Sequence, residues 1–344
     1  MKNNYNNIFI ILICIFFKVF IIVVFNLTMD KIINDFLEDK IDKLKLTLQV
    51  KYDEDQCNDE PMRCYISSIC GNRKKFDLFC KALETTIKLK SLLIQNAFIP
   101  NERQFFNSLS INNTITELEI SNSSNIDVKQ LCEAIENNNL KILRLNSTKL
   151  YNLDYLFEFL KTNTTIKELE ITNFNRNHMI YDVNMFELKT LYEALLINKT
   201  LTKLNLSYNY IKSIKPLCEV LMINRSLQII DLSNNMITDI EPLSKVLQCN
   251  NKIKKIILYS NSIKNISPLY KALKINCGLQ KIDLSYNNIS EINFEIFFNI
   301  LECNNSLVKI NLYQNICEDY IKLHKEQLDK LKNLSKEKDV KLII

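Results

Sequence analysis

A short pattern of apolar and polar residues recurs along most of the chain. In one copy, Leu204 and Leu206 alternate with polar residues, which is the spacing of a half-buried strand. Further along, Leu217, Val220 and Leu221 fall on one face of a short helix. Each copy of the pattern therefore predicts one strand followed by one helix.

The copies follow one another at a nearly constant interval. Nine of them open at Leu89, Ile115, Leu140, Ile166, Leu201, Leu227, Ile253, Leu279 and Leu307. The intervals are 26, 25, 26, 35, 26, 26, 26 and 28 residues. A period of this length is typical of a solenoid, in which each unit buries its apolar face only against its neighbours. The longest interval contains an insertion around His178, which either serves binding, as extra loops in solenoids often do, or is passive.

An asparagine stands three residues before eight of these openers. The eight are Asn112, Asn137, Asn163, Asn198, Asn224, Asn250, Asn276 and Asn304. Asparagine tolerates the left-handed conformation that ends many helices, so we expect these residues to stop the helices. Proline suits the first turn of a helix, and Pro216, Pro242 and Pro268 predict where three of them begin.

A more specific motif, L-x-x-L-x-L-x-x-N-x-I in one-letter code, is present in four consecutive copies. These open at Leu201, Leu227, Ile253 and Leu279, with some leucines replaced by isoleucine. The motif resembles the leucine-rich repeat family, and the helical half of each copy resembles its ribonuclease-inhibitor-like subclass, here with short repeats of about 26 residues. The resemblance covers residues 76–316. It implies an α/β leucine-rich repeat solenoid that is curved, with parallel β-strands on the concave face and short helices on the convex face.

The resemblance also predicts a difference between the halves of the chain. In the family, the asparagine of the motif bonds to neighbouring backbone groups and forms a ladder. That position is filled in the later copies by Asn209, Asn235, Asn261, Asn287 and Asn315. In the earlier copies it is filled by Ala97, Ser123, Thr148 and Phe174. We therefore expect a looser first half.

The chain is expected to contain four segments. Residues 1–28 are either a signal-anchor or a spurious extension, and residues 29–75 form an N-terminal cap with a non-repeat insertion. Residues 76–316 hold about nine repeats, and residues 317–344 form a C-terminal cap.

The two interpretations of residues 1–28 predict different cellular locations for the protein. Ile8 to Phe25 are apolar except for Lys18, which is long enough for a membrane span. Met29 begins a polar, helix-like stretch and is an equally good candidate for the initiating methionine. The first interpretation predicts a single-pass membrane protein, and the second predicts a cytoplasmic one.

Composition argues against several kinds of chemistry. The chain has only two glycines and two histidines, which excludes a phosphate-binding glycine loop and leaves no zinc-ligand spacing. The net charge of +5 is spread out and does not indicate nucleic-acid binding. Cys57, Cys64 and Cys70 in the insertion fit free thiols better than a disulfide or a metal site. We therefore expect no catalytic residue, no cofactor and no metal.

Side chains alternate along a strand, so the residues between the buried leucines predict the composition of the concave face. The early copies contribute Glu117, Glu119, Glu168 and Glu170, and the later copies contribute a column of Lys203, Lys255, Lys281 and Lys309. Tyr208, Tyr259, Tyr286 and Tyr313 lie on or beside that column. Tyrosine is favoured at binding surfaces because it offers a large contact area at low entropic cost.

We therefore expect a non-catalytic scaffold that binds one or more protein partners, of unknown identity, through this face. Two alternatives remain at this point. One is a membrane-anchored recognition protein, and the other is an adaptor or regulator of an enzyme, such as a ubiquitin-ligase substrate receptor or a GTPase activator.

Overall fold

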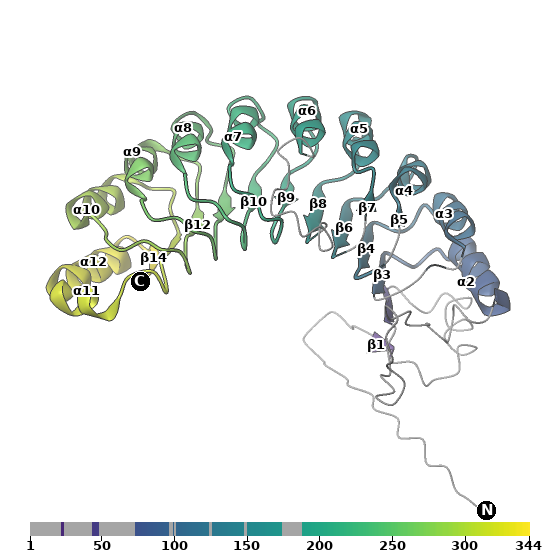
Figure 1. Ribbon diagram of the computed structural model, residues 1–344, viewed down its shortest axis with the longest axis horizontal. Helices are drawn as coiled ribbons and strands as arrows, with labels where there is room; N and C mark the ends of the chain where they lie inside the picture. The colour runs from purple at the N-terminus through teal and green to yellow at the C-terminus, as the bar shows by residue number, and fades with distance from the viewer. Residues whose placement is uncertain are drawn as a thin grey trace, which may run out of the picture. The chain divides into compact units, whose positions relative to one another are not determined.

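The computed structural model describes residues 22–23, 43–47, 73–95, 99, 101–123, 126–147, 150–173 and 188–344. It divides into two compact units, Met1–Leu156 and Phe157–Ile344. In each unit, parallel strands alternate with helices along the chain and form an open sheet (Figure 1). The predicted α/β solenoid is therefore confirmed.

The first unit has a parallel sheet in the order β1-β2-β3-β4-β6. Its strands are β1 (Ile22–Val23), β2 (Lys43–Thr47), β3 (Ser91–Gln95), β4 (Glu117–Ser121) and β6 (Ile142–Asn146), with a separate pair β5 (Ile126–Asp127) and β7 (Leu150–Tyr151). The helices are α2 (Arg73–Thr85), α3 (Glu102–Ile111) and α4 (Val128–Ile135). Helix α5 (Asp154–Thr162) contains the division between the units.

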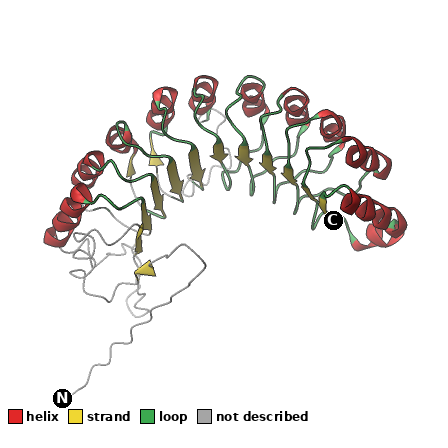
Figure 2. Ribbon diagram, turned by 180° about the vertical axis from the view of Figure 1, so that it is seen from behind, coloured by secondary structure: helices red, strands yellow, loops and turns green. Residues whose placement is uncertain are grey.

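The second unit continues the same alternation. Its strands are β8 (Glu168–Thr172), β9 (Lys203–Asn205), β10 (Ile229–Asp231), β11 (Lys255–Ile257), β12 (Lys281–Asp283), β13 (Lys309–Asn311) and β14 (Lys341–Ile343). Its helices are α6 (Lys189–Ile197), α7 (Lys215–Leu221), α8 (Glu241–Cys249), α9 (Ser267–Ile275), α10 (Phe294–Cys303), α11 (Glu318–Leu323) and α12 (Lys325–Glu337). Helices α6–α10 lie on one side of the strands (Figure 2). We call the opposite side of this sheet the open face, because no described helix covers it.

The core lies between the strands and the helices. Leu204 and Leu206 are buried, as the alternation predicts, and Leu217, Val220 and Leu221 of α7 are buried beside them. Helices α7, α8 and α9 each have proline in the first turn, which confirms the predicted helix starts. Because each helix packs only on its own strand and on adjacent repeats, one open face remains along the sheet.

The turn from each helix to the next strand is made by the side chain of a buried asparagine. The Nδ2 of Asn224 donates to the backbone oxygens of Leu195, at 2.7 Å, and Asn198, at 3.3 Å. Its Oδ1 accepts from the backbone nitrogens of Ser226 and Leu227, both at 3.0 Å. One amide side chain thus satisfies backbone groups of two neighbouring repeats.

From Asn198 onwards, the asparagine at each such turn donates to the backbone oxygen of the equivalent asparagine in the preceding repeat. This ladder runs through Asn163, Asn198, Asn224, Asn250, Asn276 and Asn304, with donor–acceptor distances between 2.8 and 3.3 Å. In five turns the motif is Asn-x-Ser/Thr, at Asn112, Asn163, Asn198, Asn224 and Asn304. The hydroxyl of Thr200, for example, donates to the same backbone oxygen of Asn163 at 3.3 Å.

The predicted left-handed conformation of these asparagines is wrong. The helix-capping members of the set are Asn112, Asn198, Asn250, Asn276 and Asn304, and all have extended backbone, with φ between −112° and −64°. Extended backbone directs the chain back towards the sheet. The side-chain hydrogen bonds, rather than a left-handed residue, hold this turn together.

For one of the eight turns, the predicted asparagine is not the one that forms the turn. Asn137 is exposed, and its neighbour Asn138 is buried and donates to the backbone oxygen of Leu109 at 2.9 Å. The displacement follows from α4, which ends at Ile135 and is followed by turn residues. The Oδ1 of Asn138 has no hydrogen-bond partner, so this turn is less complete than the others described.

Left-handed residues occur instead where the strands end. They directly precede the asparagine of the motif and are Tyr208, Asn234, Ser260, Tyr286 and Gln314, with φ between 52° and 61°. The asparagines that follow form the predicted second ladder. Asn235, for example, donates to the backbone oxygen of Leu206 at 3.0 Å and accepts from the backbone nitrogens of Asn209 and Ile211 at 3.0 and 2.9 Å.

In the earlier copies, Ala97, Thr148 and Phe174 lie outside the described residues. Ser123 is described and buried, and its hydroxyl donates to the backbone oxygen of Ser121 at 3.2 Å. The looser first half therefore remains a prediction.

Candidate protein-binding face

Parallel register brings the predicted lysines of the second unit into one line on the open face. Lys255 lies opposite Lys281, Lys281 opposite Lys309, and Lys309 opposite Lys341. We call these four residues the lysine row. Lys341 was not among the predicted site residues, although the mainly apolar segment 340–344 after a polar helix was a usable signal for a last strand.

Lys203 occupies the same column but is neutralised by neighbours. Its Nζ lies 3.2 Å from a carboxylate oxygen of Glu168 and 3.1 Å from one of Glu170. Burial acts to lower the pKa of Lys203, but the hydrogen bonds and charges of the two glutamates outweigh it and raise the pKa. Lys203, Glu168 and Glu170 therefore form a local charge cluster.

The predicted glutamates of the first unit, Glu117 and Glu119, lie beside a basic residue. Glu117 forms an ion pair with Arg144, and Glu119 lies directly opposite Arg144 in the sheet register. Together with Glu168 and Glu170 of the second unit, Glu117 therefore contacts a basic side chain. Their charge is partly cancelled within the protein, which leaves less of it for a partner.

The lysine row differs in this respect. Among the described residues, no carboxylate forms an ion pair with any of its four members. Lys281 and Lys341 are exposed, and Lys255 and Lys309 are half-buried. Within the described part of the chain, the positive charge of this row is therefore not neutralised by ion pairs.

Three tyrosines form a continuous aromatic line at the far end of the same strands. The ring centroids of Tyr259 and Tyr286 are 5.2 Å apart, and those of Tyr286 and Tyr313 are 5.8 Å apart, both edge-to-face. Tyr286 and Tyr313 are 47% and 45% exposed. We call these three residues the tyrosine row. The predicted tyrosines are thus brought together, except for Tyr208, which is exposed and belongs to a more distant repeat.

Two tyrosines on this face hold an uncommon backbone conformation. Tyr208 and Tyr286 have φ of 61° and 54°. Bulky residues rarely adopt this conformation, whereas asparagine adopts it more readily, as Asn234 does at the equivalent position. Strained residues of this kind cluster at functional sites.

Two parts of the second unit match models of a known family. Residues 199–245 match a model of leucine-rich repeats in two copies, and residues 278–300 match a model of a single leucine-rich repeat. This is a leucine-rich repeat protein. No curated protein matches the chain. Leucine-rich repeat domains generally mediate protein–protein interactions, and the matched residues include Lys203 and Lys281 of the open face.

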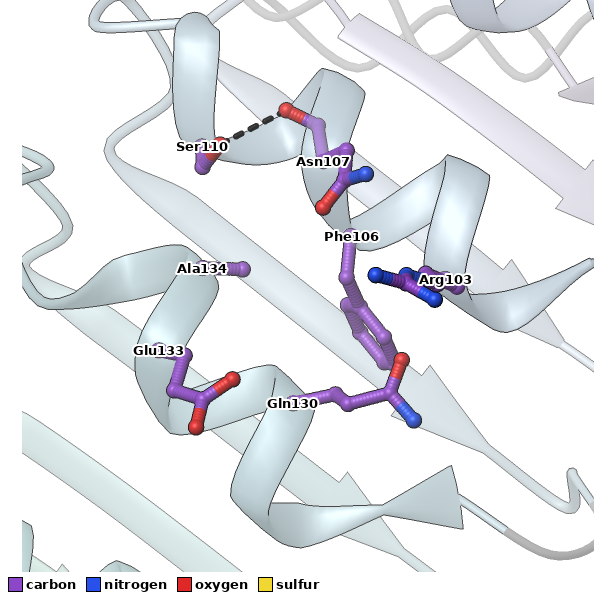
Figure 3. A pocket seen from close by; sticks show the side chains of 7 residues that line it. All are labelled: Arg103, Phe106, Asn107, Ser110, Gln130, Glu133 and Ala134. Carbon is purple, nitrogen blue, oxygen red and sulfur yellow. Dashed lines mark hydrogen bonds between the residues drawn. The ribbon is translucent and has the colours of Figure 1, made fainter.

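The leucine-rich repeat protein also has a cavity that the sequence did not predict. It lies between α3 and α4 of the first unit, has a volume of about 410 Å³ and is shown in Figure 3. Its lining residues are Arg103, Phe106, Asn107, Ser110, Gln130, Glu133 and Ala134. The hydroxyl of Ser110 is already used in a 2.7 Å hydrogen bond to the backbone oxygen of Asn107. No sequence motif marks this cavity, and it contains none of the predicted site residues.

Several predictions for the leucine-rich repeat protein fall outside the described residues. These concern Met29, His178, and Cys57, Cys64 and Cys70. Of the predicted anchor Ile8–Phe25, only Ile22 and Val23 are described, and they form β1. No helix within the described ranges is both long and apolar enough to span a bilayer.

Proposed function

We propose that this leucine-rich repeat protein is a non-catalytic scaffold that binds a protein partner through the open face of its second unit. The observation that carries the proposal is the lysine row, which has no ion-pair partner among the described residues. It lies on the strands that lead into the tyrosine row, in which Tyr286 and Tyr313 are exposed. Regularly placed charge and exposed aromatic rings are the features that supply specificity and contact area at protein interfaces.

We also propose that the repeats are of the ribonuclease-inhibitor-like kind. This assignment is supported by the outer helices, since α6, α8 and α9 each contain nine residues. The period of 26 residues between Leu201, Leu227, Ile253 and Leu279 is consistent with it.

Affinity capture with charge-reversed variants tests the proposed face. The full-length protein is used as bait, and bound proteins are identified and quantified for the wild type and for Lys255→Glu combined with Lys281→Glu. We expect the double reversal to reduce capture of the specific partner by about tenfold or more, because two attractive contacts become repulsive.

The matched control combines Lys252→Glu with Lys271→Glu. Both of these lysines are exposed and lie away from the open face, Lys252 in the turn after α8 and Lys271 on α9. The net charge of the two double variants is therefore the same. Equal capture by both variants and the wild type would count against the open face as the binding surface.

A further inference from the structure

The lysine row presents positive charge in a regular geometry. Neighbouring strands lie about 4.8 Å apart, so its four members repeat at that interval across β11–β14. Like charges directly opposite each other on adjacent strands repel and reduce stability. Lys203 lies opposite Glu168 and Ile229, not opposite another lysine, and it is paired with two glutamates. No carboxylate within the described ranges forms such a pair with the lysine row. A partner that supplied carboxylates at the same interval would remove the repulsion.

The distance between the two rows matches the width of a helix. Tyr259 follows Lys255 by four residues and lies two residues beyond the end of β11, which corresponds to about 13 Å where the chain is extended. An α-helix with its side chains is about 10–12 Å across. A helix lying across the strands would therefore contact the lysine row along one side and the tyrosine row along the other.

The interval along the rows also favours a helix. The four lysines span three intervals of about 4.8 Å, or about 14 Å. Three turns of an α-helix cover about 16 Å, whereas three same-side steps of an extended strand cover about 20 Å. A stripe of carboxylates on a helix therefore stays close to register with the lysines, and one on a strand does not.

The residues between the lysine row and the tyrosine row disfavour the binding of a continuous polyanion. They include Asp283 on β12. The carboxylate of Asp283 accepts two hydrogen bonds from Nδ2 of Asn311, at 3.0 and 3.1 Å, which hold it in place. A nucleic-acid backbone following the lysine row would bring phosphates close to Asp283. A helix can present its acidic residues on the lysine side alone.

We propose that strands β11–β14 bind an amphipathic acidic helix of a partner protein. Its carboxylates contact the lysine row, and the apolar residues on its adjacent side pack against the tyrosine row. This inference rests on the proposed function, since it names the kind of partner that the open face accepts.

Binding of designed probes tests the inference. The full-length protein is titrated with a fluorescent, alanine-based helical peptide that has glutamates three and four residues apart on one face and leucines on the adjacent face. The comparison probes are a peptide of the same composition with its glutamates distributed around the helix, and a single-stranded oligonucleotide. At low ionic strength, we expect the patterned helix to bind at least about tenfold more tightly than either comparison probe.

Variants link the preference to the lysine row. Lys281→Glu combined with Lys309→Glu should abolish the preference, whereas Lys281→Arg combined with Lys309→Arg should retain it, because arginine preserves the charge. The control Lys252→Glu with Lys271→Glu should leave it unchanged. The helix assignment is overturned by equal binding of the two peptides, by tighter binding of the oligonucleotide, or by a preference that survives reversal of Lys281 and Lys309.

The two proposals fail in different ways. If the probes show no preference but capture of the partner still depends on Lys255 and Lys281, the helix assignment is wrong and the proposed function stands. If capture does not depend on those lysines, the proposed function is wrong as well.

Discussion

Asparagine has two separate roles at the scale of single residues. At the helix-to-strand turns, Asn224 and its equivalents keep extended backbone and use the side chain to bond two repeats. At the strand ends, Asn235 and its equivalents form hydrogen bonds with backbone groups of the preceding repeat. The chain contains only two glycines. The left-handed positions that directly precede the asparagines at the strand ends are therefore occupied by other residues, including Tyr208 and Tyr286.

Replacing Tyr208 with asparagine should stabilise the protein. The left-handed backbone at Tyr208 is unfavourable for a bulky residue and better tolerated by asparagine, so we expect a gain of about 1 kcal/mol. Asn234→Ala at the equivalent position should have the opposite effect, because alanine lacks the local hydrogen bonding that favours this conformation. Urea unfolding midpoints measure both changes. A lower midpoint for Tyr208→Asn would show that the ring contributes more stability than the strain removes.

The thiols should fall into two groups in an alkylation experiment. Burial raises the pKa of Cys80, Cys132 and Cys218 to about 12 each. Four other described thiols are exposed, namely Cys249, Cys277, Cys303 and Cys317. Because the thiolate is the reactive form, iodoacetamide at neutral pH should modify the exposed group of the native protein and leave the buried group intact.

Site-resolved mass spectrometry checks this result, with the urea-unfolded protein as the control in which all of these thiols react. The raised pKa values also predict how the stability of the folded protein changes with pH. The buried thiols contribute stability below about pH 9, and that contribution is lost as the pH rises towards about 12, because the unfolded state ionises first. Stability that increased over this range would contradict the assignment.

At the scale of elements, each repeat is a strand and a helix joined by one asparagine-centred turn. The alternation of Leu204 and Leu206 and the helical spacing of Leu217 and Leu221 predicted these elements, because burial alone sets both patterns. The conformation of the turn was not predictable in the same way. Residue type identified asparagine as the turn residue, but not whether a left-handed backbone or side-chain hydrogen bonds would form the turn.

Asn224→Ala should destabilise the protein far more than Asn137→Ala. Removal of the Asn224 side chain leaves the buried backbone groups of Leu195, Ser226 and Leu227 without their partner, at a cost of about 2–3 kcal/mol. Asn137 is exposed, so its substitution should cost less than about 0.5 kcal/mol. Chemical unfolding of the two variants measures the difference. Similar losses would mean that the hydrogen bonds at Asn224 contribute little.

At the scale of the whole molecule, the sequence predicted the repeats and the columns of the sheet more completely than the charges on it. Constant spacing placed Lys255, Lys281 and Lys309 in one column, and the register confirms that placement. The ion pairs of Lys203 with Glu168 and Glu170 depend on how long side chains reach across neighbouring strands. A repeat pattern carries no information about that reach, so the division between paired and unpaired lysines required the structure.

Hydrogen exchange should be faster in the repeats before Leu201 than in those after it. The later repeats carry a ladder from Asn209 to Asn315, in which each asparagine bonds backbone groups of adjacent turns. Ser123 at the equivalent early position offers a single hydroxyl where an asparagine offers an amide with two donors and an acceptor oxygen. Amide exchange resolved by peptide mass spectrometry tests this. Slower exchange before Leu201 would contradict the predicted difference.

The Asn-x-Ser/Thr sequence of these turns is also a substrate for a covalent modification. The same tripeptide is the acceptor sequence for N-linked glycosylation, which attaches a sugar to the side-chain nitrogen of asparagine. At Asn224 that nitrogen is buried and donates to Leu195 and Asn198 of the preceding repeat. In a compartment that glycosylates nascent chains, sugar transfer and folding would therefore compete for the same atom, and a glycan that arrived first would keep adjacent repeats from closing.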